Sequence, residues 1–120
     1  MKYTPSHEWV QINDDIGTVG ISEFVRKELG EIVYVELPTV GKIVQAGEEI
    51  VVIESTKAAA DIYSPVSGII TEINISLQSM PLLINSSPEG EGWLFRIRLL
   101  DQKEIDDLLL PEEYKKLLEV

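Results

Sequence analysis

The chain has 120 residues, 44% of them hydrophobic and 26% charged, so it is long enough for one globular domain with its own core and too short for two ordinary domains. Ten basic residues against 21 acidic ones give a formal net charge of −11 at pH 7. This charge disfavours nucleic acids and anionic membranes as partners, because both are bound through Lys and Arg. The chain has no cysteine, which excludes disulfides, thiolate nucleophiles and cysteine-based metal sites.

The first residues include no apolar signal stretch and no arginine-rich presequence. No apolar run approaches the roughly 20 residues that a bilayer-spanning helix needs. We therefore expect a cytoplasmic protein.

Short runs rich in Val, Ile and aromatic residues, bounded by Gly, Pro, Asn or Asp, predict seven strands. Turn sequences between strands occur at Asn13-Asp14-Asp15 and from Pro38 to Gly41. Many short strands at close spacing favour a small sandwich or barrel over βαβ units. The predicted strands cover Trp9–Ile12, Ile16–Gly20, Ile32–Leu37, Ile50–Ile53, Asp61–Tyr63, Gly68–Ile75 and Trp93–Leu99.

Two stretches predict helices. Ser22 is placed to cap the first turn of a short helix that Gly30 ends. Near the end of the chain, Asp101 and Glu104 resemble a capping box, and Pro111 stands at a favourable first helical position. Apolar residues at helical spacing follow both points, so we expect two short helices against the sheet. The acidic residues between them argue against membrane attachment through this apolar stripe.

Residues for self-sufficient catalysis are scarce. His7 is followed by Glu8, but neighbours on a strand point to opposite faces, so the pair is poorly arranged as a base and its orienting group. We interpret His7 as a structural or surface residue, and no spacing typical of metal ligands is recognisable. A phosphate-binding loop, a dinucleotide fingerprint and a nucleophile elbow are absent from the sequence. We therefore predict no catalytic residue and no metal site.

The stretch from Val51 to Gly68 contains the strongest functional signal. An apolar strand leads into small or polar residues centred on Lys57, and a second strand follows. This pattern predicts Lys57 at the tip of a hairpin, where the small neighbours Thr56 and Ala58 let another protein approach. A long, flexible amine in that position is able to take an acyl group by amide formation. The alternative is an ordinary solvated lysine.

This stretch resembles the attachment site of biotinyl and lipoyl carrier domains, whose fold is a flattened barrel of two antiparallel sheets with the modified lysine in a hairpin turn. Biotin carriers usually place methionine on both sides of the lysine. Thr56 and Ala58 therefore favour lipoate. Glu54 and the stretch from Asp61 to Gly68 are similar to lipoyl attachment sites in general.

Motifs outside this stretch resemble those of the glycine cleavage H-protein family, in order along essentially the whole chain. Lipoyl domains of the 2-oxoacid dehydrogenase complexes lack the leading segment and the C-terminal helices. The resemblance implies one carrier domain over 1–120, with the flattened barrel-sandwich architecture, an attachment hairpin at about 50–64 and a helical segment at about 101–119. The motifs are Tyr3-Thr4-Pro5-Ser6-His7-Glu8-Trp9-Val10, Val19-Gly20-Ile21-Ser22, Leu29 to Pro38, Leu83-Ile84-Asn85 and Gly90-Glu91-Gly92-Trp93.

The resemblance implies a non-catalytic carrier that bears lipoate on Lys57 as N6-lipoyllysine. In this family the lipoyl arm receives an aminomethyl group from a pyridoxal-phosphate glycine decarboxylase, and an aminomethyltransferase passes the one-carbon unit on. A dihydrolipoyl dehydrogenase then reoxidises the arm. The implied partners are these three enzymes and the lipoylating enzymes, without nucleic acid or membrane.

The resemblance also implies that the loaded arm folds into a cleft, whose polar groups here are Ser6, Glu8 and Asp61. Carboxylates and a hydroxyl stabilise a cationic amine, and enclosure slows attack by water. Glu54 and Asp61 are in addition expected to be read by the lipoylating enzymes. The alternatives are a turn-capping serine and solvated carboxylates.

Two departures from the family pattern leave a second function open. Glu28 stands where some members have histidine near the cleft, and the sequence differs around Met80-Pro81-Leu82 and at Glu89. The alternative function is an H-like lipoate-binding protein that serves sulfur oxidation or relays lipoyl groups to other proteins. A third possibility is an unmodified structural domain.

Overall fold

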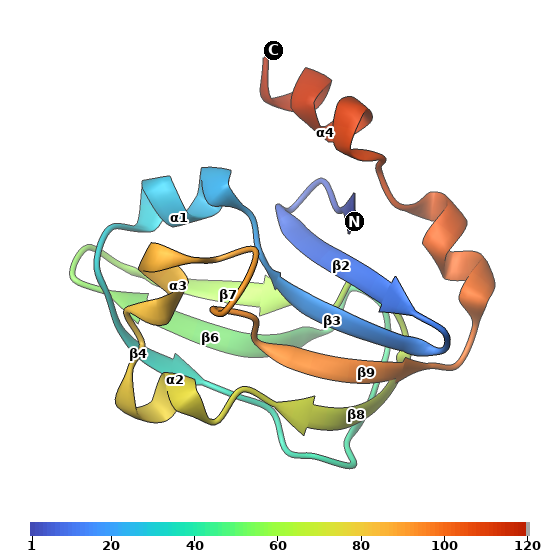
Figure 1. The fold of residues 1–120 in the computed structure, drawn as a ribbon, viewed down its shortest axis with the longest axis horizontal. Coiled ribbons are helices and arrows are strands. Elements are labelled where there is room, and N and C mark those ends of the chain that lie inside the picture. Colours follow the sequence, from blue (N-terminus) through green and yellow to red (C-terminus); the bar gives the residue numbers. More distant parts are fainter. Residues whose placement is uncertain (120) are drawn as a thin grey trace.

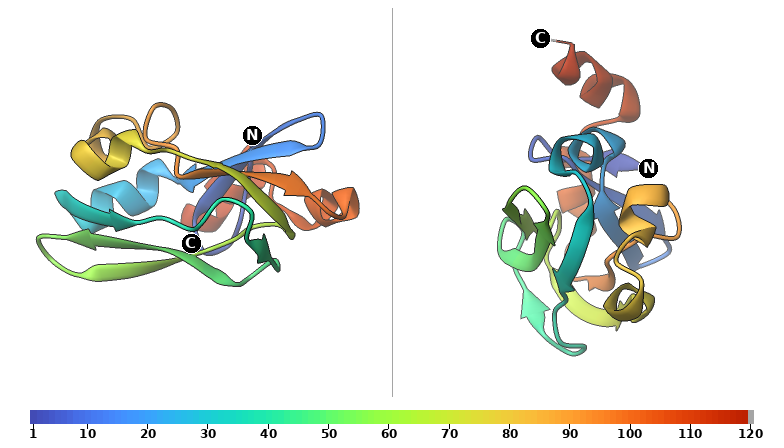
Figure 2. Two further views of the ribbon diagram at one scale, coloured as in Figure 1. Left: turned by 90° about the horizontal axis from the view of Figure 1, so that it is seen from below. Right: turned by 90° about the vertical axis from the view of Figure 1, so that its left-hand side faces the viewer.

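Two antiparallel sheets pack face to face in the computed structural model, which describes residues 1–119 (Figure 1; Figure 2). The larger sheet has the strand order β1-β2-β3-β9-β8-β5, and the smaller has the order β4-β6-β7. The predicted fold class is therefore confirmed, although the sheets do not close into a barrel. The strands are β1 (Lys2–Tyr3), β2 (Glu8–Asn13), β3 (Ile16–Ile21), β4 (Ile32–Glu36), β5 (Ile43–Val44), β6 (Glu49–Ser55), β7 (Ala59–Tyr63), β8 (Gly68–Ile73) and β9 (Phe95–Leu99).

The helices are short and connect or flank the sheets. The predicted helix near residues 22–29 and the predicted helical segment near the end of the chain are confirmed. The helices α2 and α3 were not predicted, because four residues are too few to show helical periodicity. Among residues 1–119, no helix combines the length and the apolar character needed to cross a membrane. The helices are α1 (Glu23–Leu29), α2 (Ser76–Ser79), α3 (Leu83–Ser86), the 3-10 helix η1 (Gln102–Asp107) and α4 (Pro111–Leu118).

Helix α1 has the termini that the sequence predicts. The Ser22 backbone is extended, and its Oγ accepts a hydrogen bond from the Val25 amide at 3.4 Å. Gly30 follows the last helical residue with φ of +79°, a conformation that favours glycine. The chain then turns directly into β4, which brings the end of α1 close to the smaller sheet (Figure 1).

The segment after β9 departs from the predicted capping box. Asp101 caps η1 by accepting a hydrogen bond from the Lys103 amide at 2.9 Å. Glu104, however, accepts from the Ser67 amide at 2.7 Å and from the Ser67 hydroxyl at 2.8 Å. In the predicted capping box the Glu104 carboxylate would accept from the Asp101 amide. In the structure it accepts from Ser67, which lies on a distant loop.

Helix α4 lies against the larger sheet, as expected, by packing on its edge strand β1, and it projects beyond that edge (Figure 1). The buried ring of Tyr114 stacks on Tyr3 with centroids 4.4 Å apart. The Tyr114 hydroxyl is hydrogen bonded to His7 Nδ1 at 2.8 Å and to Ser22 Oγ at 2.7 Å. His7 therefore has the structural role that the sequence predicted.

The core lies between the two sheets, and buried side chains of β6 and β7 anchor the β6–β7 hairpin in it. The strands of both sheets turn apolar side chains inward, and the alternation is interrupted where the strand register shifts, between Ile32 and Tyr34 in β4 and between Glu49 and Val51 in β6. The inward side chains are removed from water, and each contributes about 1.5–3 kcal/mol through burial. Core residues of the strands that are at most 3% exposed come from both sheets: Val10, Val19, Ile21, Val44, Ile70, Phe95 and Ile97 from the larger, and Ile32, Val35, Val51, Ile53 and Ile62 from the smaller.

Candidate functional site: the lysine hairpin

Lys57 lies at the tip of the hairpin that joins β6 to β7. The two strands pair antiparallel up to Glu54 opposite Ala59. The Ser55 amide then donates to the Ala58 carbonyl at 2.8 Å and closes a four-residue turn. Thr56 and Lys57 are the two central residues of this turn, and both are exposed. The structure thus places Lys57 where the sequence predicts it.

Ser55 organises the turn and was missed by the sequence analysis. Its Oγ accepts hydrogen bonds from the amides of Lys57 and Ala58, each at 3.1 Å, and it donates to the Ala58 carbonyl at 3.1 Å. A serine in the first position of a turn makes this pattern commonly, and that position is the signal that would have identified it.

The tip is also attached to the segment that follows α1. The Thr56 amide donates to the Glu31 carbonyl at 3.0 Å. The methylene stem of Lys57 passes next to Gly30, where an added Cβ would lie 3.3 Å from Lys57 Cε and 3.4 Å from Cδ. No salt bridge within residues 1–119 includes the Lys57 amine. The backbone of the turn is held, and the amine is left free to react.

Two carboxylates flank the turn on the outer face of the hairpin. Glu54 lies opposite Ala59, and Asp61 lies opposite Val52, so the two acidic residues are diagonal neighbours on one face. Both are exposed, whereas the alternate residues of the same strands point into the core. The structure therefore brings Glu54 and Asp61 together beside the lysine.

Ser6 and Glu8 form a separate polar group near β7. Glu8 is only 1% exposed, and its Oε1 accepts from the hydroxyls of Thr4 and Ser6, each at 2.6 Å. Its Oε2 accepts from the Tyr63 amide at 3.4 Å. Burial raises the pKa of the Glu8 carboxyl, and the hydrogen bonds from Ser6, Thr4 and Tyr63 act in the opposite direction.

Asp61 precedes Tyr63 by two residues on β7, but no hydrogen bond described for residues 1–119 joins it to Ser6 or Glu8. The three predicted cleft residues thus fall into two groups, with Ser6 beside Glu8 and Asp61 beside Glu54. A mainly apolar groove of about 530 Å³ lies elsewhere, between the start of β4 and the α2–α3 segment. Its lining residues are Glu31, Ile32, Val33, Ser79, Met80, Pro81, Leu82, Leu83 and Ser86.

The hairpin is arranged for presentation of a side chain. His7, the one histidine of the sequence, is engaged by Tyr114, and the sequence has no cysteine, so Lys57 lacks the usual nucleophile and base partners. The hairpin thus combines an exposed amine with a turn that two packed sheets support. This combination is typical of a carrier domain, in which the scaffold is rigid and the attached group is mobile.

Comparisons with known proteins agree with this class. The model of the family described as "Glycine cleavage H-protein" matches residues 1–120. The glycine cleavage system H protein of Thermotoga maritima is 51% identical over 115 residues, which cover 96% of this chain and 93% of that protein. The one of Rubrobacter xylanophilus is 54% identical over 117 residues, which cover 98% and 90%. A crystal structure of a glycine cleavage system H protein from Mycobacterium marinum superposes with a TM-score of 0.89 at 35% identity, covering 99% of this chain and 96% of that one.

The chain belongs to the glycine cleavage H-protein family. It is a lipoyl carrier subunit of the glycine cleavage system, is not itself catalytic, and works with the other components of that system. The alternative role in sulfur oxidation or lipoyl relay is not favoured, because these relatives are glycine cleavage system H proteins.

The buried Glu8 carboxyl makes a testable contribution to the pH dependence of stability. Because its pKa is raised in the folded protein, the folded state binds this proton more tightly than the unfolded chain does. The resulting stabilisation is complete below the ordinary value of 4.5 and is lost as the pH rises through the folded pKa. We therefore expect the free energy of unfolding of the native protein, minus that of Glu8→Gln, to fall as the pH rises from below 4.5 toward neutrality.

Urea denaturation at each pH measures this difference, since other groups titrate in both proteins and cancel. Glu112→Gln removes an exposed carboxylate and controls for the change in net charge. A difference that stays constant or increases with pH contradicts the prediction.

Proposed function

We propose that Lys57 is the residue that bears lipoate, through an amide bond between its Nζ and the lipoyl carboxyl group, and that 1–120 acts as one carrier domain. The observation that supports this most directly is the exposed lysine at the tip of a turn whose backbone is held by Ser55 and Glu31. Acylation of Nζ breaks no salt bridge within residues 1–119. The small exposed neighbours Thr56 and Ala58 leave room for a modifying enzyme.

Glu54 and Asp61 are proposed as the acidic residues that lipoylating enzymes recognise. Both lie on the outer face of the hairpin that presents Lys57, and both are exposed. An enzyme that reaches the amine from this face meets the two carboxylates first. Basic residues on the enzyme then orient the lysine through charge complementarity.

Ser6, Glu8 and Asp61 are proposed as the polar groups that shield the amine of the loaded arm. When bound, lipoate supplies the sulfur chemistry that carries the aminomethyl group, and the chain supplies the surroundings. Ser6 and Glu8 are already joined at 2.6 Å, and Glu8 Oε2 faces the backbone of β7, the strand that also bears Asp61. The Glu8 carboxyl is buried and the Asp61 carboxylate is exposed, and a carboxylate in either position favours a nearby cationic amine.

The proposed partners act on the arm in turn: a pyridoxal-phosphate glycine decarboxylase, an aminomethyltransferase and a dihydrolipoyl dehydrogenase. The net charge of −11 favours docking on basic surfaces of these enzymes and opposes nucleic acid or anionic membranes as partners. We assign this exchange to the cytoplasm as part of the same proposal.

Intact-mass analysis tests the attachment site. After co-expression with a lipoate ligase, we expect one lipoyl adduct on the native protein and none on Lys57→Arg, because a guanidinium does not accept the acyl group. Lys27→Arg on the neighbouring helix is the control and should keep the adduct. Both variants should have the same circular dichroism spectrum as the native protein. An adduct that persists on Lys57→Arg contradicts the assignment.

Steady-state lipoylation kinetics test the acidic residues separately. Glu54→Gln and Asp61→Asn each remove one charge while keeping the shape, and we expect kcat/KM to fall by about tenfold in at least one of them, as for loss of a charged contact. Glu49→Gln, at the other end of β6, is the control for net charge. Native rates in both variants would end the recognition hypothesis.

Reconstitution with the three enzymes and glycine tests the partners and the shielding role. We expect the lipoylated native protein to become loaded with the aminomethyl group, and the isolated loaded protein to lose it several-fold faster in Ser6→Ala and Asp61→Asn, since water gains access. Asp15→Asn on the β2–β3 turn is the control. Absence of loading contradicts the partner assignment, and unchanged loss in both variants contradicts the shielding role.

A further inference from the structure

We propose that Asn85 is a positioning residue for Lys57, acting through the segment from Gly30 to Ile32. The inference rests on the proposed attachment of lipoate to Lys57 and adds the element that sets the direction in which the lysine leaves the scaffold. Four contacts connect the Asn85 amide to the lysine: two hydrogen bonds of the amide, one hydrogen bond from Glu31 to the hairpin turn, and the packing of the Lys57 stem on Gly30.

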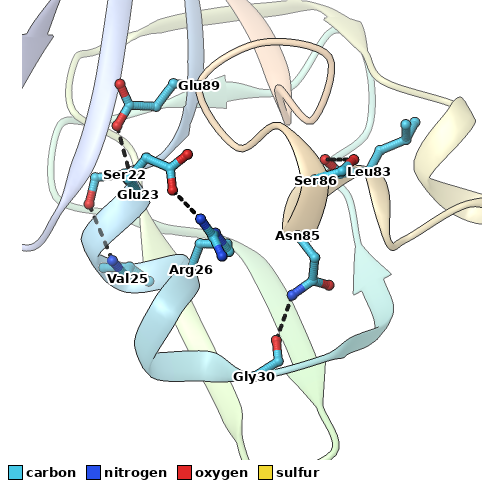
Figure 3. A network of polar contacts seen from close by, with 9 residues as sticks. All are labelled: Ser22, Glu23, Val25, Arg26, Gly30, Leu83, Asn85, Ser86 and Glu89. Atoms are coloured by element: carbon cyan, nitrogen blue, oxygen red, sulfur yellow. Dashed lines mark hydrogen bonds and ion pairs between the residues drawn. The ribbon is translucent and has the colours of Figure 1, made fainter.

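Asn85 bridges both sides of the Gly30–Ile32 segment with a single side chain. Its Nδ2 donates to the Gly30 carbonyl at 2.7 Å (Figure 3). Its Oδ1 accepts from the Ile32 amide at 2.9 Å. An inverted amide would place two acceptors together and two donors together, so the bonding pattern defines its orientation. The neighbouring Ile84 is completely buried in the core, which anchors the short helix α3 from which Asn85 projects.

The residue between these two bonds holds the tip of the hairpin. The Glu31 carbonyl accepts from the Thr56 amide at 3.0 Å. The bonds of Ser55 to the amides of Lys57 and Ala58 shape the turn internally, but they do not attach it to the rest of the molecule. The Glu31 contact does attach it, and Asn85 holds the residues on both sides of Glu31.

Gly30 contributes the surface along which the lysine stem lies. Its φ of +79° is unfavourable for any side chain, and an added Cβ would lie 3.3 Å from Lys57 Cε. Glycine therefore keeps the path of the stem open, while Asn85 holds the carbonyl of the same residue. The direction of the stem depends on where this segment sits.

A carrier lysine benefits when its backbone and the first part of its side chain are held in one conformation. Modifying enzymes meet the amine in one orientation, so less conformational entropy is lost when the reactive geometry forms. A purely structural asparagine would instead affect the free energy of unfolding alone. The two roles differ in what happens at Thr56 and Lys57 in the folded protein.

Amide hydrogen exchange by NMR tests the positioning role without lipoate. In Asn85→Ala we expect exchange at the Thr56 amide to accelerate about tenfold relative to the Ser55 amide, whose bond to the Ala58 carbonyl lies within the turn. The NOE between Gly30 Hα and Lys57 Hε should weaken or disappear. Ser86→Ala is the matched control, because the side chain of this α3 residue bonds only to the Leu83 carbonyl.

Lipoylation kinetics on the same proteins provide the functional half of the test. Asn85→Ala and Gly30→Ala should each lower kcat/KM for ligase-catalysed lipoylation several-fold at a temperature at which both variants are folded. Gly30→Ala keeps the Asn85 side chain, but it strains the backbone at a φ of +79° and places a Cβ 3.3 Å from Lys57 Cε, so it perturbs both the segment and the stem. Asn85→Asp keeps the acceptor toward Ile32 and replaces the donor toward Gly30, and serves if Asn85→Ala does not fold.

Where the native protein is lipoylated on Lys57, support requires both a faster Thr56 exchange and slower lipoylation in the Asn85 variant. Native values of either quantity overturn the proposal, including the case in which only the free energy of unfolding falls. If the native protein takes no lipoyl group on Lys57, the proposed attachment fails. In that case the exchange and NOE measurements still decide whether Asn85 positions the lysine.

Discussion

The register between β6 and β7 is the constraint on which the site depends. Ile53 and Ile62 are buried between the sheets, and their burial determines which face of each strand looks outward. Glu54 and Asp61 consequently lie on the outer face, and the turn at Lys57 projects from the end of the sandwich. A shift of one residue would bury the carboxylates and expose the isoleucines, which makes the alternative register very costly.

The two ends of the chain are joined in one aromatic and polar cluster. Tyr114 of α4 stacks on Tyr3 and shares its hydroxyl with His7 and Ser22. Burial raises the pKa of both tyrosine phenols above the ordinary value of 10.0, so both remain protonated at a pH at which an exposed phenol would ionise. Tyr3 also donates to Glu89 at 2.9 Å. The other oxygen of that carboxylate accepts from the Glu23 amide in the first turn of α1 (Figure 3).

This cluster explains why a carrier needs more than the hairpin. It holds the leading segment in the position in which Glu8, which accepts a hydrogen bond from Ser6, also accepts one from the Tyr63 amide of β7. The same cluster fixes the start of α1, and the end of α1 delivers Gly30 to the lysine stem. The lysine, the buried Glu8 carboxyl and the glycine beside the lysine stem are therefore held by one connected scaffold.

The sequence by itself determined the features that depend on a few consecutive residues. The strand pattern, the Ser22 cap, the turn at Lys57 and the family motifs are of this kind, because backbone conformation and short-range hydrogen bonds decide them. Only the tertiary structure decided which distant groups meet. Glu104 bonds to Ser67 across 37 residues, and Asn85 bonds to Gly30 across 55. Such pairs leave no periodic signal, since their geometry arises from the packing of the sheets and not from the local chain.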